Sequence, residues 1–278
     1  MSASLALCAC LALAPGAAPA PAGPWLIEFG LTGDQLQARA TQLQKAGYRP
    51  SGVTGYNDGE FPRFAVIWEK GAGPAWRLDF GLTPAQFDRR ATQLKADGFR
   101  PVALSGYDLG GTQGFIDIWR KTDGPAYEVN YGTSGDGLGR LALSMKERGY
   151  RPTHLSSYVS GTVSRYATLW EKGGDEVWDL KWGLTTGQLD DSLNQMPLAG
   201  YRPVALTALV VEEITNFSMI WSKRKGPPWL VRYNLDGDGL LDLARTQRGR
   251  GYRPIHLSGY GTLGGIRFTT IWEQTPMK

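Results

Sequence analysis

Hydrophobic and polar residues alternate in a pattern that returns every 51 residues along the chain. In the first copy, residues 25–29 alternate apolar and polar side chains, which is typical of a strand with one face in water. Apolar residues then recur at helical spacing between residues 36 and 43. Two further extended segments follow at residues 53–56 and 64–68. Each copy is therefore predicted to form a strand, a helix and two more strands.

The tetrapeptide GYRP, or GFRP in the second copy, stands between the helix and the second strand of every copy. A glycine just after a helix takes the left-handed conformation at no steric cost, and proline cannot continue a helix. We interpret the motif as a helix stop followed by entry into the sheet. Its first residue recurs at Gly47, Gly98, Gly149, Gly200 and Gly251. The predicted N-caps also share one column, Thr32, Thr83, Ser134, Thr185 and Asp236.

The arginine of the motif has two readings. It caps the last helical carbonyls or pairs with Glu69, Glu171 and Glu273, although Arg120 and Ser222 stand in that acidic column elsewhere. The alternative is a set of arginines that lines a ligand site. The column consists of Arg49, Arg100, Arg151, Arg202 and Arg253.

Tryptophans occupy fixed positions in the repeat, which favours a role in the core over a role as a ligand platform. One column begins the copies, with Trp25, Trp76, Tyr127, Trp178 and Trp229. The other column closes the third strand, with Trp68, Trp119, Trp170, Trp221 and Trp272.

These elements predict an α+β fold of five tandem repeats, with modules at residues 25–75, 76–126, 127–177, 178–228 and 229–278. We expect each connection between modules to be a hairpin that pairs the last strand of one module with the first strand of the next. Pairing of the two end strands would then give a closed or nearly closed ring, with an open arc as the alternative. The absence of special capping modules favours the ring.

Composition narrows the class of protein. The formal net charge is +4 and the basic residues are scattered, which argues against nucleic-acid binding. Residues 1–22 carry no charge and resemble a signal peptide, which predicts a secreted or periplasmic repeat domain at residues 23–278. Cys8 and Cys10 both lie in this leader, so no disulfide framework is expected after it. We expect a monomer without stable membrane insertion, cofactor or metal.

Two strand faces carry the only histidines. His154, Ser156 and Tyr158 alternate along one strand, and His256, Ser258 and Tyr260 repeat the set in the last module. A hydrolase would use the serine as nucleophile and the histidine as base. However, neighbours on one strand face lie about 6.5–7 Å apart, beyond hydrogen-bond reach. A polar face that contacts a ligand is favoured, with Tyr56 and Tyr107 completing the tyrosine column and Leu209 replacing it in module four.

Two shorter motifs favour structural readings. Residues 222–225 match the S-x-x-K string of penicillin-binding enzymes but lack the rest of that signature, so we interpret them as a solvated turn. Residues 234–242 resemble part of a calcium loop but lack its closing glutamate, and Asp236 falls in the N-cap column.

The combined columns "GYRP", "LS.Y", "RF", "WE" and "GP.W" resemble a bacterial tandem-repeat family over residues 25–274. That family occurs alone or attached to secreted serine hydrolases of the β-lactamase-like type, and the N-terminal half of fungal polyglycine hydrolases is similar to it. In those hydrolases the chemistry belongs to a separate domain that this chain lacks. The resemblance implies a non-catalytic module that binds an extracellular polymer or protein. A secreted serine hydrolase and a purely structural spacer are the alternatives.

Overall fold

The computed structural model describes residues 25–173 and 176–274. The first module consists of β1 (Trp25–Leu31), α1 (Gly33–Lys45), β2 (Tyr48–Asp58) and β3 (Phe61–Lys70). The other four repeat this order, with β4 (Trp76–Leu82), α2 (Pro84–Ala96), β5 (Phe99–Leu109), β6 (Thr112–Lys121), β7 (Tyr127–Thr133), α3 (Gly135–Glu147), β8 (Tyr150–Ser160), β9 (Val163–Lys172), β10 (Trp178–Leu184), α4 (Thr186–Leu198), β11 (Arg202–Val211), β12 (Ile214–Ser222), β13 (Trp229–Leu235), α5 (Gly237–Gly249), β14 (Tyr252–Thr262) and β15 (Gly265–Gln274). The predicted α+β repeat is confirmed.

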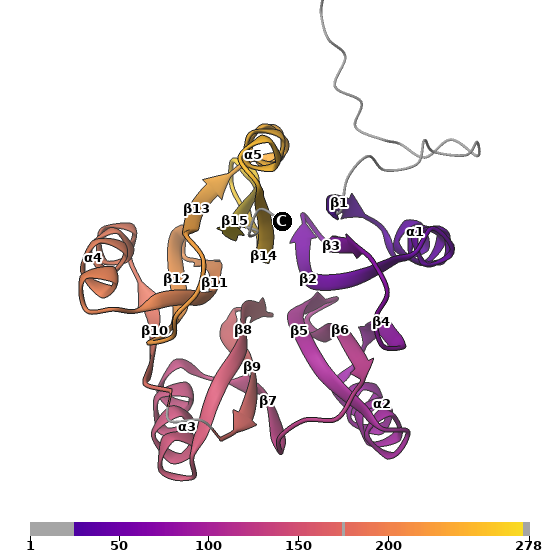
Figure 1. The fold of residues 1–278 in the computed structure, drawn as a ribbon, viewed down its shortest axis with the longest axis horizontal. Coiled ribbons are helices and arrows are strands. Elements are labelled where there is room, and N and C mark those ends of the chain that lie inside the picture. Colours follow the sequence, from indigo (N-terminus) through magenta and orange to yellow (C-terminus); the bar gives the residue numbers. More distant parts are fainter. Residues whose placement is uncertain (1–24, 174–175, 275–278) are drawn as a thin grey trace, which may run out of the picture.

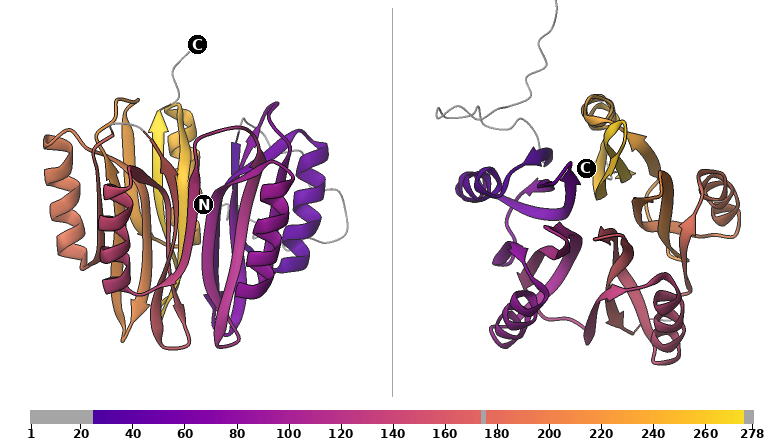
Figure 2. Two further views of the ribbon diagram at one scale, coloured as in Figure 1. Left: turned by 90° about the horizontal axis from the view of Figure 1, so that it is seen from below. Right: turned by 180° about the vertical axis from the view of Figure 1, so that it is seen from behind.

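Each module forms a separate three-stranded sheet in which the third strand lies between the first two, as in the order β1-β3-β2. The five sheets stand around a common axis, with the second strand of each module innermost and the helices outside (Figure 1). The long strands run along this axis (Figure 2). The fifth module contacts the first as other neighbours contact each other, since β14 lies beside β2 just as β2 lies beside β5.

The predicted hairpin between modules is wrong. β1 pairs with β3 of its own module, and β4 pairs with β6, so no sheet crosses a module boundary within the described residues. The strand-helix-strand connection leaves a gap between β1 and β2, and β3 fills it by turning back from β2. The end strands therefore do not pair with each other, and neighbouring modules contact through side chains.

The helix boundaries follow the sequence signals. All five predicted N-cap residues are N-caps, and Thr32 forms a capping box with Gln35. Gly47 has φ +79° directly after the C-cap Ala46, and the equivalent glycines are also left-handed. Pro50 lies inside β2 beside a bulge between Pro50 and Gly52, and not at the start of the strand. A proline fits there because β2 is an edge strand.

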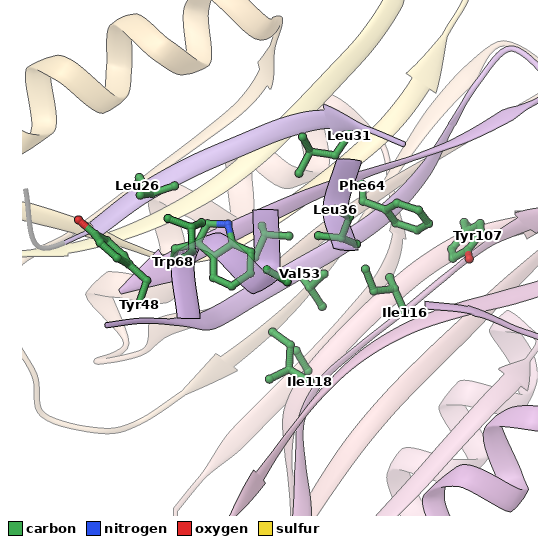
Figure 3. Close-up of a cluster of buried hydrophobic side chains, with 14 residues drawn as sticks. Leu26, Leu31, Leu36, Tyr48, Val53, Phe64, Trp68, Tyr107, Ile116 and Ile118 are labelled. Atoms are coloured by element: carbon green, nitrogen blue, oxygen red, sulfur yellow. The ribbon is translucent and has the colours of Figure 1, made fainter. Parts of the chain in front are cut away.

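The core is continuous between modules. Leu36 and Leu43 of α1 and Trp68 of β3 pack in one cluster that also contains Tyr107 and Ile118 of the second module (Figure 3). All five closing tryptophans, predicted as core, are at most 1% exposed. No helix in the described part of the chain is long and apolar enough to cross a bilayer.

Candidate functional site

The hairpin turns that join the second and third strands of all five modules surround a pocket at one end of the axis. Its volume is about 930 Å³. The turns lie together at this end because every module has the same element order and stands the same way around the axis (Figure 2). A pocket of this size is in the range of ligand sites in proteins.

Exposed apolar side chains stand at the turns around this pocket, and two of them, Phe61 and Leu263, line it. Phe61, Val163, Ile214 and Leu263 stand at four of the five turns, and Leu263 is 86% exposed. Single exposed apolar side chains are common on protein surfaces, whereas a contiguous group of them marks an interaction surface. We call these four residues the apolar rim.

The fourth turn carries backbone strain. Glu212 and Glu213 have φ of +50° and +66°, a region that non-glycine residues seldom occupy. Glycines take this conformation in the corresponding turns, as Gly110 and Gly111 do. Both glutamates line the pocket; Glu212 stands at the position of Gly59 and Gly110, whereas Glu213 stands at the position of Glu60, which lines the pocket as well.

The predicted tyrosine column lines the pocket from below the rim. Tyr56, Tyr107, Tyr158 and Tyr260 are among its lining residues, yet each is at most 4% exposed. The Tyr56 hydroxyl accepts a hydrogen bond from the backbone N–H of Gly30 at 2.8 Å. Gly30 lies at a β-bulge with φ +71°, which removes its N–H from the ladder. The hydroxyl replaces that lost partner.

Tyrosine rings also connect neighbouring modules. A Cβ on Gly55 would lie 2.3 Å from the ring of Tyr107, and one on Gly106 would lie 2.3 Å from Tyr158. Each ring thus packs on the bare backbone of the preceding module. Burial raises the pKa of Tyr107 to about 12, so its hydroxyl remains protonated near neutral pH.

The predicted serines take part in a hydroxyl belt between inner strands. The N–H of Gly106 donates to Ser156 Oγ at 3.2 Å, and the N–H of Gly259 donates to Thr54 Oγ1 at 3.2 Å. Ser258 Oγ lies 3.0 Å from Thr207 Oγ1. These hydroxyls satisfy N–H groups of strands that form sheet edges, which explains why a hydroxyl recurs in every module.

The two histidines are buried beside the axis. Their ring centroids are 5.7 Å apart, and His256 Nε2 donates to the Leu206 carbonyl at 2.9 Å. Burial lowers the pKa of His154 to about 4 and that of His256 to about 3, with His154 also lowering the latter. Both are therefore neutral near pH 7. Among the hydrogen bonds of the described residues, none joins Ser156 or Ser258 to a histidine, so the geometry of an activated serine is not assembled there.

The arginine column lies at the opposite end of the inner strands, where it connects modules. Arg202 Nη2 lies 2.9 Å from Glu273 Oε1, and Arg100 Nη2 lies 3.2 Å from Glu171 Oε1. Each pair joins one module to the next. A Cβ on Gly124 or Gly226 would collide with these guanidinium groups, which explains the glycine in the "GP.W" motif. The predicted pairing with the acidic column occurs mainly between modules, and Arg151 also pairs with Glu171 of its own module at 3.2 Å.

The remaining sequence motifs have structural positions. Ser222 of the S-x-x-K string ends β12, is buried, and its hydroxyl donates to Glu176. Ser222 therefore belongs to the sheet, which corrects the interpretation for this residue, whereas residues 223–225 are exposed and lie outside the strands, as predicted for a solvated turn. Asp236 caps α5, accepting from the N–H of Gly239 at 2.8 Å. The predicted leader at residues 1–22 lies outside the described residues.

A model of the polyglycine hydrolase-like structural repeat matches the chain five times, at residues 22–71, 73–122, 124–173, 177–224 and 226–275. The chain belongs to this family. The matches cover all five modules, so every module of this chain is a member of the repeat family. The resemblance drawn from the sequence columns is confirmed.

Sequence reasoning missed the apolar rim of the pocket. Phe61, Thr112, Val163, Ile214 and Gly265 share one column, and their variation hides the column from a search for recurring residues. The available signal was a large apolar residue directly after a turn, where solvation favours polar residues.

Proposed function

We propose that this repeat domain is a non-catalytic recognition module that binds an extended polymer or protein segment in the axial pocket. The observation that carries the proposal is the apolar rim around a pocket to which all five modules contribute. A rim of exposed aromatic and aliphatic groups provides the contact surface, and five turns provide several weak contacts at once.

The lining carries carboxylates from Glu60, Asp108, Glu212 and Glu213, so it disfavours a negatively charged ligand. Gly55, Gly106 and Gly259 bring bare backbone to the pocket beside the tyrosine rings. The family name refers to polyglycine hydrolases, so a glycine-rich peptide is the first ligand to test. The uncharged leader supports a role outside the cytoplasm, as a secreted or periplasmic protein.

Retention on immobilised polymers tests the proposal. The chain is passed over peptidoglycan, chitin, cellulose and a glycine-rich peptide, together with the triple variant Phe61→Ser/Ile214→Ser/Leu263→Ser. These side chains are exposed, so the variant is expected to fold like the parent. The matched control is Leu143→Ser/Leu198→Ser, which removes two equally exposed apolar groups from α3 and α4.

We expect the parent and the helix control to be retained on at least one polymer and the rim variant to be released. Equal retention of all three proteins would place binding elsewhere. Failure of the parent to bind any of the four would reject polymer recognition for these classes.

A further inference from the structure

At four of the five contacts between modules, the arginine of GYRP meets a carboxylate beyond its own module's sheet. Arg100, Arg202 and Arg253 pair with Glu171, Glu273 and Glu69 at 3.2, 2.9 and 3.4 Å. Arg151 faces a module with serine in the acidic column. It pairs with Glu176 of the connecting segment at 2.8 Å, which also accepts from Ser222, and with Glu171 of its own module at 3.2 Å.

The contact between modules one and two departs from this rule. Arg120 occupies the acidic column there, so Arg49 meets a second guanidinium. Burial lowers the pKa of Arg120, and repulsion from Arg49 lowers it further, with Glu69 opposing. Glu69 already pairs with Arg253. Within the described residues, neither Arg49 nor Arg120 forms a salt bridge with a carboxylate.

Both guanidinium groups are held in place by backbone carbonyls. Arg49 Nη1 donates to the Ala72 carbonyl, and Arg120 Nη2 donates to the Pro50 carbonyl at 3.1 Å. The Nε atoms of both residues are buried without a hydrogen-bond partner. Arg49 Nη2 and Arg120 Nη1 have no partner within the described residues either, and they are not among the buried atoms.

A bound oxyanion would supply the hydrogen-bond acceptors and the negative charge that this contact lacks. Phosphate and carboxylate groups have adjacent oxygens that match guanidinium donors, and they provide the negative charge that glutamate provides elsewhere. We propose that the contact between modules one and two is a binding site for a small oxyanion, held by Arg49 and Arg120. The site lies at the opposite end of the inner strands from the axial pocket and does not depend on the proposed function.

The probe is inorganic phosphate, with acetate in a second arm to separate phosphate from carboxylate recognition. Binding is measured by isothermal titration at constant ionic strength set with chloride. The test variant is Arg120→Glu, which restores the acid found at this column in three modules. Arg120→Ser reproduces module four and provides a second variant if the first fails to fold. Arg245→Ala on the exposed face of α5 is the control for general attraction to basic residues.

We expect phosphate or acetate to bind the parent and the control with one site, and binding to weaken at least tenfold in either Arg120 variant. Thermal unfolding of the parent should shift upward with the anion, and that of Arg120→Glu should not. Absence of binding by both anions, or equal binding by the Arg120 variants, would overturn the proposal.

Discussion

The two ends of the molecule use the same repeat in different ways. At the end where the inner strands begin, the arginine column is constant, and three of its members form ion pairs with a neighbouring module. At the end with the hairpin turns, one column holds Phe61, Val163 and Ile214 among unrelated residues, and these side chains are exposed. Residues that are the same in every module therefore lie where modules pack together, and residues that differ between modules lie on the surface available to a ligand.

The largest effect is expected from breaking a buried pair at the constant end. Glu273→Gln removes the partner of Arg202, whose side chain is 8% exposed, and leaves a buried charge. We expect a loss of about 4 kcal/mol in the free energy of unfolding, measured in urea. Asp242→Asn, which breaks the exposed Arg245 pair, should cost less than about 1 kcal/mol. A similar loss in the free energy of unfolding for both variants would show that the buried pair at this end does not stabilise the fold more than an exposed pair does.

Acid should lower the free energy of unfolding, because two buried histidines lie in the middle of the inner strands. The folded-state pKa values of His154 and His256 lie below the usual 6.5, so their contribution is present above pH 6.5 and is lost as pH falls toward about 4. A shift from 6.5 to about 4 corresponds to about 3 kcal/mol. We expect His154→Ala/His256→Ala, which matches Ala103 and Ala205 in this column, to lose less stability between pH 7 and 4 than the parent. Parallel pH profiles in urea unfolding would reject this.

Near the pocket, a tyrosine ring packs on glycine at some contacts between modules and on a larger residue at another. Gly106→Ala would place a methyl 2.3 Å from the Tyr158 ring and should cost about 2 kcal/mol. Module four carries Ala208 in this column, in one core cluster with Tyr260. The control Ala208→Gly should therefore cost about 1 kcal/mol through loss of a methyl group. A neutral Gly106→Ala would show that the ring moves freely.

A buried carboxyl provides a variant that gains stability. Asp117 is buried, and burial raises its pKa well above the usual range, with Asp79 adding to the effect. A raised pKa means that its contribution is present at low pH and is lost as pH rises. In modules three and five this column holds threonine, and Thr168 Oγ1 accepts from Trp170 Nε1 at 2.8 Å. We expect Asp117→Thr to gain about 1 kcal/mol at pH 7 and less at pH 4, in urea unfolding.

The smallest effect on stability is expected at the apolar rim. Each change in Phe61→Ser/Ile214→Ser/Leu263→Ser should alter the free energy of unfolding by less than about 0.5 kcal/mol, because the side chains are exposed. A larger loss in urea unfolding would show that the rim is part of the core.

The sequence predicts the module well because its signals are local. N-caps such as Thr32 and the glycine after each helix depend on neighbours within one copy, and the buried tryptophans recur at one fixed position in every copy. It does not predict that β1 pairs with β3 and not with the preceding module, because strand order depends on a crossover between distant segments. The tyrosines were predicted to contact a ligand, and they line the pocket from within the core. The rim was missed because its residues differ between copies.

Hydrogen exchange with a soluble glycine-rich peptide tests most directly whether recognition belongs to the hairpin end. The account predicts that the peptide slows exchange at residues 58–61, 109–112, 160–163, 211–214 and 262–265, and leaves the start of the inner strands at residues 48–50 unchanged. Protection centred on the helices or on the arginine end, or no protection anywhere, would contradict it.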